Sequence, residues 1–243
     1  MSLSSSGQCN GASGLTSPDC SDCQEAVEVL APDGGYNAGA MCAIQPSTSP
    51  TPFNVWCPFN GNTMTILIYR VQTATGWSQL DWKTYMWNQY KHGMGRYDKL
   101  NFFVGLENMR TFLSQAAYRL NMFNIYISPP PVNPLKQPSY FNITLQDEAN
   151  SYALSYFLYT ASDGTATDLE SFQGANVSHP FCTKDNDCGT CATDNGPGWY
   201  YTGSGGCVGT SPFAIKAEWP YENLGLFTLG STEYSFERVG DFY

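Results

Sequence analysis

The most suggestive residues for binding chemistry are three consecutive aromatics, Trp199-Tyr200-Tyr201, set among glycines and followed by Cys207. Aromatic rings in a hollow built from loops stack on the C–H faces of sugars or enclose acetyl methyl groups, while backbone amides nearby supply hydrogen bonds. The run therefore predicts a ligand site. The same pattern also suits rings that anchor a poorly packed loop region to the core.

Two carboxylates stand two residues apart in Asp185-Asn186-Asp187, shortly before Gly189. Carboxylate oxygens together with loop carbonyls can surround a calcium ion. An EF-hand is excluded, because its twelfth position needs a bidentate Glu and that position is Gly196 here. The segment is either another kind of calcium site, with ligands from Asp185, Asp187 and Gly189, or a polar turn without metal.

Residues for catalysis are scarce, so we expect no enzyme. His92 and His179 are the two histidines, and no G-x-S-x-G sequence accompanies them as a nucleophile elbow would require. The pairs Cys20-x-x-Cys23 and Cys188-x-x-Cys191 have zinc-ligand spacing, but no histidine pair completes either. Disulfides are the favoured interpretation of these cysteines.

The cysteine content predicts an oxidising compartment. Nine cysteines would be vulnerable in a reducing cytosol, whereas a secreted chain would pair them. Two N-glycosylation sequons, at Asn142 and Asn176, indicate the same location. The first residues lack the apolar core of a signal peptide, so we expect that a signal has been removed.

The charge balance narrows the range of partners. The net charge is −10, from 21 acidic and 11 basic residues, and the basic residues form no cluster. Nucleic-acid binding is therefore not expected, since phosphate backbones attract clustered Lys and Arg. No apolar run is long enough to span a bilayer, so no transmembrane segment is expected.

The elements that must position these residues read as an α+β domain with a mainly antiparallel sheet. The chain shows no regular alternation of helices and strands, which a parallel sheet would require. Residues 1–22 read as a tail or linker. Apolar patterning predicts helices at 24–30, 82–90 and 107–115, and strands at 52–57, 64–71, 101–106, 118–127, 140–145, 153–159, 213–218 and 232–236.

Several segments, taken in order, resemble the fibrinogen C-terminal globular domain found in fibrinogen chains, ficolins, tachylectins and angiopoietins. The resemblance rests on Met64–Arg70, on the stretch from Trp87 to Gly95, on Phe102–Met109, on Thr183–Asp187, and on the stretch from Cys191 through Trp199-Tyr200-Tyr201 to Cys207. It covers the chain from residue 22 nearly to the end.

This resemblance implies a division of residues 23–243 into three parts. These are a small N-terminal unit (23–60) closed by Cys23–Cys57, a central sheet (61–160 with 213–243), and a loop-rich binding part (161–212). It implies a Cys191–Cys207 disulfide and calcium at Asp185 and Asp187. The implied pocket receives acetylated sugars or a peptide, and its residues here are Trp199, Tyr200, Tyr201, Gly206, Cys207 and Val208.

Departures from the family pattern lead to further expectations. Val208 stands where the family often has His, and the short segment from Cys207 to Phe213 removes one wall of the pocket. Two extra cysteines, Cys182 and Cys188, are expected to pair and stiffen the calcium loop. For the others we expect Cys20–Cys42, with Cys9 linking to another chain in an oligomer.

The sequence thus predicts an extracellular recognition domain. The first hypothesis is a lectin-like domain for acetylated glycans. The second is a protein-binding module that uses the same loop-rich face, because a pocket with a missing wall leaves a flatter surface, which suits protein partners.

Overall fold

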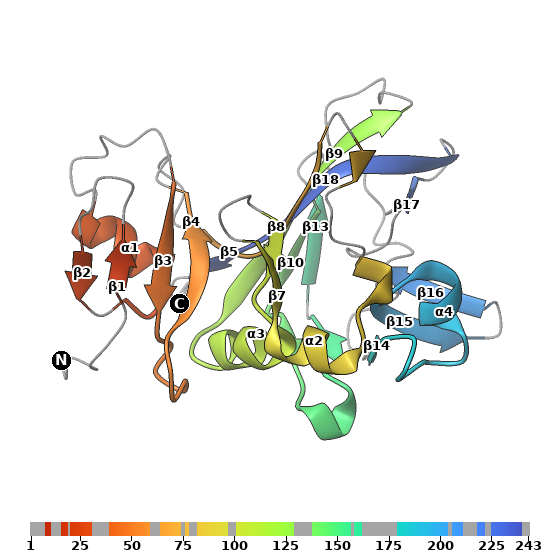
Figure 1. Cartoon of the computed structure of the whole chain (residues 1–243), viewed down its shortest axis with the longest axis horizontal. Coiled ribbons are helices and arrows are strands. Elements are labelled where there is room, and N and C mark those ends of the chain that lie inside the picture. The colour runs from red at the N-terminus through yellow and green to blue at the C-terminus, as the bar shows by residue number, and fades with distance from the viewer. Residues whose placement is uncertain are drawn as a thin grey trace.

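The computed structural model describes residues 8–10, 16–18, 20–30, 39–58, 64–73, 76–77, 82–96, 101–128, 138–156, 158–161, 179–203, 206–210, 218–221 and 225–239. Their fold is a long, mainly antiparallel sheet with short helices beside it, which confirms the α+β prediction (Figure 1). The N-terminal strands lie at one end of the molecule, and a small second sheet with its own helix lies at the other (Figure 1).

The long sheet runs in the order β13-β10-β9-β18-β5-β4-β3-β1-β2, and every neighbouring pair is antiparallel. Its centre is the pair β9 and β18, two long strands matched from Tyr118↔Arg238 to Ser128↔Thr228. The strands of this path are β1 (Gln8–Asn10), β2 (Thr16–Pro18), β3 (Ala40–Ile44), β4 (Phe53–Cys57), β5 (Thr65–Thr73), β9 (Tyr118–Ser128), β10 (Pro138–Phe141), β13 (Leu158–Ala161) and β18 (Gly225–Arg238). Short strands β6 (Gly76–Trp77), β7 (Met94–Arg96), β8 (Asn101–Phe103) and β17 (Glu218–Tyr221) pair beside it.

The N-terminal segment corrects the prediction of a tail at 1–22. Strands β1 and β2 form a hairpin whose first strand pairs with β3. An edge strand leaves backbone N–H and C=O groups exposed, and the pairing with β1 covers part of this edge of β3. In that register Cys9 lies opposite Cys42.

The helices form where an apolar stripe can face the sheet. In α3 (Leu106–Leu113) the buried residues Leu106, Met109, Phe112 and Leu113 recur at helical spacing. The predicted helix at 82–90 is divided into the 3-10 turn η1 (Trp82–Thr84) and α2 (Trp87–His92), and the predicted helix at 24–30 is α1 (Cys23–Leu30).

Two predicted strands are interrupted. The strand expected at 140–145 is divided into β10 and β11 (Thr144–Leu145), because Asn142 adopts a left-handed turn conformation with φ 49° and Ile143 turns into the core. The strand expected at 153–159 becomes β12 (Leu154–Ser155) and β13, and a 3-10 turn, η3 (Glu148–Asn150), precedes β12. Of the strand predicted at 213–218, residues 213–217 lie outside the described residues, and Glu218 begins β17.

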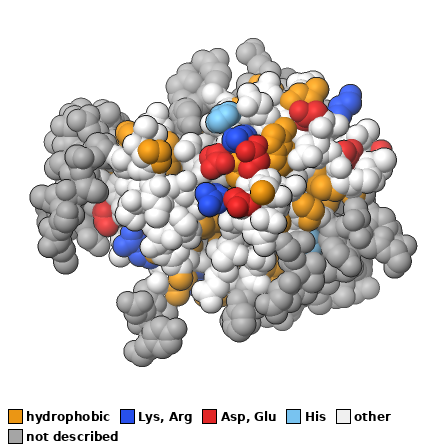
Figure 2. All heavy atoms as spheres, turned by 90° about the horizontal axis from the view of Figure 1, so that it is seen from below, with side chains coloured by type: hydrophobic (Ala, Val, Ile, Leu, Met, Phe, Trp, Pro, Cys, Tyr) orange, Lys and Arg blue, Asp and Glu red, His pale blue; other side chains and the backbone are white. Residues whose placement is uncertain are grey.

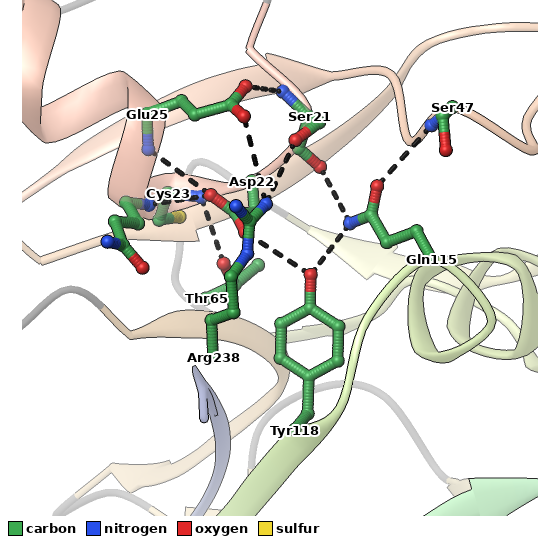
Figure 3. Close-up of polar contacts among 10 residues, drawn as sticks. Ser21, Asp22, Cys23, Glu25, Ser47, Thr65, Gln115, Tyr118 and Arg238 are labelled. Atoms are coloured by element: carbon green, nitrogen blue, oxygen red, sulfur yellow. Dashed lines mark hydrogen bonds and ion pairs between the residues drawn. The ribbon is translucent and has the colours of Figure 1, made fainter. Parts of the chain in front are cut away.

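A polar cluster around Asp22 joins the N-terminal unit to the central sheet (Figure 3). The buried carboxylate of Asp22 lies 2.5 Å from Arg238 of β18 and accepts a hydrogen bond from the Tyr118 hydroxyl of β9. It also accepts hydrogen bonds from the backbone N–H groups of Gln24 and Glu25, so it caps the first turn of α1. One carboxylate therefore holds a helix and two strands together.

The disulfides largely follow the sequence expectations. Cys23–Cys57 closes the N-terminal unit, and Cys182–Cys188 is also formed. Cys20 and Cys42 are both buried, and the expected Cys20–Cys42 bridge is not among the disulfides of the described residues.

Candidate functional site

The loop-rich part is organised around a three-stranded antiparallel sheet. It consists of β14 (Phe181–Cys182), β15 (Gly198–Gly203) and β16 (Gly206–Thr210), with β15 in the centre. The short helix α4 (Cys191–Asn195) lies beside these strands (Figure 1). Because consecutive side chains in a strand point to opposite faces, Trp199 and Tyr200 of β15 enter two different cores.

Trp199 belongs to the main core of the domain. Its side chain is fully buried, its ring meets that of Phe181 edge to face at 4.9 Å, and its indole N–H donates to the Tyr152 carbonyl oxygen. A buried indole needs such a partner for its N–H group. Trp199 is therefore an anchor that fixes β15 on the domain.

Tyr200 enters a second, smaller core. Its ring packs with Cys182, Cys191 and Ala192, and its hydroxyl donates to the Gly196 carbonyl oxygen at 2.6 Å. Two of the three predicted ligand-binding rings, those of Trp199 and Tyr200, are thus buried. They act as anchors of a loop region, which was the alternative interpretation of the aromatic run.

The other predicted ligand-binding residues gather at the free end of the β15–β16 hairpin. Tyr201 lies opposite Val208, Thr202 opposite Cys207, and Gly203 opposite Gly206. The backbone register therefore puts Tyr201 and Val208 at paired positions near the end of this hairpin.

Asp185 lies in a tight turn between β14 and α4. Backbone hydrogen bonds run in both directions between Thr183 and Asn186, which closes the turn. Asp185 Oδ1 accepts hydrogen bonds from the Thr183 hydroxyl at 2.7 Å and from the Trp87 backbone N–H at 2.9 Å. Asp185 therefore connects this turn to the start of α2.

Asp187 is directed at the first turn of α4. Its Oδ1 accepts from the Ala192 N–H at 2.8 Å, and its Oδ2 accepts from the N–H and hydroxyl of Thr193 at 3.1 and 2.6 Å. Desolvation would raise the pKa of Asp187, but the hydrogen bonds from Thr193, Ala192 and Cys188 outweigh it and hold the pKa below its ordinary value. The charged form is thus stabilised by the protein itself.

This donor set does not fit a calcium ion well. Calcium takes six to eight oxygen ligands, whereas the oxygens of Asp187 already accept three hydrogen bonds and Asp185 Oδ1 accepts two. Within the described residues no group of three or more His, Cys, Asp and Glu side chains could hold a metal. Calcium at Asp185, Asp187 and Gly189 remains a prediction, and no step below depends on it.

The groups that hold the two aspartates could not be recognised from the sequence. Thr193 carries no recognisable spacing signal, and the Trp87 N–H lies far away in the sequence. Only the packing of α2 against the loop brings Trp87 to Asp185.

Three cysteines of the loop-rich part, Cys182, Cys188 and Cys191, are disulfide-bonded. Cys182 is bonded to Cys188, and Cys191 is also disulfide-bonded. The side chain of Cys207, its predicted partner, lies outside the described part, so the Cys191–Cys207 pairing stays a prediction.

The two histidines occupy different environments. His92 is exposed on α2, whereas His179 is fully buried where its backbone pairs with Leu154. Desolvation lowers the pKa of His179 to about 4, so its ring is neutral at physiological pH.

Sequence comparison decides the family. The chain matches the family described as "Fibrinogen beta and gamma chains, C-terminal globular domain" over residues 19–211, which is most of its length. The chain belongs to this family. No curated protein matches its sequence.

Solved structures show the same fibrinogen-type fold at low sequence identity. The fibrinogen-like globe domain of human ANGPTL2 is 20% identical with a TM-score of 0.65, covering 90% of this chain and 98% of that one. The equivalent domain of human ANGPTL6 is 19% identical with a TM-score of 0.67, covering 93% and 99%. A lamprey fibrin D-dimer in complex with the peptide Gly-His-Arg-Pro-amide is 21% identical with a TM-score of 0.64, covering 92% and 76%.

The described surface of this fibrinogen-like chain shows intermixed charges. On the face that Figure 2 shows, acidic and basic side chains lie next to each other. Among the ion pairs of the described residues, Lys91 of α2 lies 2.6 Å from Glu148 of η3. Among the described residues no helix is long and apolar enough to cross a membrane.

Proposed function

We propose that this chain is an extracellular recognition domain that binds a protein or peptide ligand at the free end of the β15–β16 hairpin. The observation that carries the proposal is the register of the hairpin, which places Tyr201 opposite Val208 and Cys207 next to them. The fibrin relative whose structure contains a bound peptide supports a ligand of this class.

The burial of two aromatic rings favours this ligand over an acetylated glycan. Sugar recognition of the predicted kind requires exposed aromatic faces, whereas Trp199 and Tyr200 are buried and donate their polar hydrogens to backbone carbonyls. A protein ligand can use backbone groups and the remaining side chains of the hairpin end without a stacking platform.

An oxidising, extracellular location agrees with the covalent structure. The disulfides Cys23–Cys57 and Cys182–Cys188 are stable in such a compartment. Asn142 of the first sequon is exposed in a turn, so it is accessible for a glycan. The second sequon, Asn176, lies outside the described residues, and an oligomer linked through Cys9 stays a prediction.

Parallel selection on a random peptide library and an acetylated glycan array tests the proposal. We expect the wild-type domain to retain a family of related peptides, and Tyr201→Ala and Val208→Ser to lose them with unchanged melting temperatures. Asn54→Ala, at an exposed position of β4 at the other end of the molecule, is the matched control. Retention of glycans alone would contradict the ligand class, and peptide binding that survives both hairpin variants would contradict the site.

A further inference from the structure

The loop between β14 and α4, residues 183–190, is where the family resemblance implies a calcium ion. The contacts made by this loop lead to a different conclusion. We propose that protein groups hold the loop in place of a cation, so that its conformation and stability do not depend on calcium. Asp187, Asp185 and the Cys182–Cys188 disulfide make the three attachments.

The first attachment is from Asp187 to α4. A helix begins with backbone N–H groups that have no partner within the helix, and a carboxylate that accepts their hydrogen bonds stabilises both itself and the helix. Asp187 does this with the N–H groups of Ala192 and Thr193, and the Thr193 hydroxyl adds a third donor. These hydrogen bonds therefore stabilise the charged carboxylate without a metal.

The second attachment is from Asp185 to α2. Its Oδ1 accepts the backbone N–H of Trp87, the first residue of α2, and the Trp87 ring packs 5.6 Å from that of Tyr152 in the core. Asp185 thus attaches the loop to α2, whereas Asp187 attaches it to α4.

The third attachment is covalent. The Cys182–Cys188 disulfide joins the end of β14 to the loop just before Gly189 and Thr190, both of which have positive φ values of 64° and 76°. Thr190 pays a conformational cost there, because residues with a side chain rarely adopt this region. The disulfide precedes Gly189 and Thr190, and the residues that donate to Asp187 follow them. These two restraints hold Thr190 in its unfavourable conformation.

Three of the loop carbonyl oxygens also accept hydrogen bonds. Those of Thr183 and Asn186 accept each other's N–H groups, and that of Thr190 accepts the Asp194 N–H of α4. Calcium would have to displace several of these bonds to reach its usual number of ligands.

Calcium itself is the probe for the test, with the disulfides kept oxidised. We expect titration calorimetry with calcium chloride to show no binding, and the melting temperatures in millimolar calcium and in chelator to agree within about 1 °C. A specific site filled far above its Kd would raise the melting temperature by about 5 °C or more.

Variants distinguish the attachments from a hidden ion site. Asp187→Ala is expected to lower the melting temperature by about 2–6 °C, with no recovery in calcium. The matched control is Asp194→Ala, an exposed carboxylate of α4 that accepts one hydrogen bond from the Thr190 hydroxyl, with a loss of about 1 °C or less. A calcium-induced rise that disappears in Asp185→Asn or Asp187→Ala would overturn the proposal, whereas a rise that persists in both would place an ion elsewhere and leave it standing.

Discussion

Asp22 is the residue at which three distant parts of the chain meet. Burial raises its pKa, and the Arg238 guanidinium opposes that shift. Tyr118 donates to Asp22, and Gln115 donates both to the Tyr118 hydroxyl and to the Ser21 carbonyl (Figure 3). The Asp22–Arg238 ion pair thus fixes the N-terminal unit on the sheet.

We predict that Asp22→Asn lowers the free energy of unfolding by about 2 kcal/mol, because it removes the buried counter-ion of Arg238 while the amide oxygen can still cap α1. Urea denaturation followed by tryptophan fluorescence measures the loss. Glu25→Gln is the control, since Glu25 is more exposed and 3.7 Å from Arg238, and its loss should be below about 0.5 kcal/mol. Equal losses for the two variants would show that burial of the pair is unimportant.

His179 predicts how stability depends on pH. Its folded pKa of about 4 lies below its ordinary value of 6.5, so between these values the unfolded chain binds more protons than the folded one. Stability from this residue is therefore complete above pH 6.5 and is lost as pH falls toward 4, by up to about 3 kcal/mol.

Chemical denaturation at several pH values checks this prediction. His179→Gln should remove the contribution and flatten the curve between pH 6.5 and 4, whatever its effect on absolute stability. His92→Gln, at an exposed position, should keep the wild-type slope. Parallel curves for wild type and His179→Gln would mean that His179 does not titrate with folding.

At the scale of elements, two glycines allow α2 and α3 to meet. Gly93 caps the end of α2 and Gly105 precedes α3, with φ values of 93° and 98°. A Cβ atom on Gly105 would lie 2.5 Å from the Gly93 nitrogen and 2.6 Å from the His92 carbonyl carbon. These are backbone atoms, so the contact cannot be relieved by a change of rotamer.

We predict that Gly105→Ala lowers the free energy of unfolding by about 3 kcal/mol, because it combines an unfavourable backbone angle with overpacking. Ser151→Gly is a control of opposite sign. Ser151 has a φ of 52° without being a glycine, so the change should be neutral or stabilising by up to about 1 kcal/mol. Thermal melts of both variants test these expectations. An unchanged stability of Gly105→Ala would contradict the close approach of Gly105 to the backbone of Gly93 and His92.

Sequence reasoning located most elements where local patterning decides them. The apolar spacing of α3 and the β-branched run of β5 sufficed for that. It failed where tertiary contacts decide: the left-handed turn at Asn142 divides a predicted strand, and pairing with β3 turns part of a predicted tail into β1. At the candidate site, residue types predicted a ligand-binding role for Trp199 and Tyr200, but only their packing partners reveal that both are buried.

At the scale of the whole molecule, two described disulfides close chain loops of different length. Cys23–Cys57 spans 34 residues and Cys182–Cys188 spans 6. The entropy lost by the unfolded chain grows with the size of the closed loop, which predicts stabilisation of about 4 and about 2 kcal/mol, respectively.

Double alanine variants of each pair test this order. Cys23→Ala with Cys57→Ala should be the more destabilising change in urea denaturation, and it should loosen the N-terminal unit first in limited proteolysis. The same measurements in reducing agent serve as the control, because there wild type and variants should converge. The reverse order of losses would show that local strain or packing outweighs chain entropy.

The proposed recognition surface lies at one end of the domain, on a small sheet that Trp199 fastens to the main core. Hydrogen–deuterium exchange of the domain with and without a selected peptide tests that claim most directly. The account predicts slower exchange of backbone amides in residues 198–210, with no change in β4 at the opposite end. Protection confined to α2, α3 or the N-terminal strands, with residues 198–210 unaffected, would contradict it.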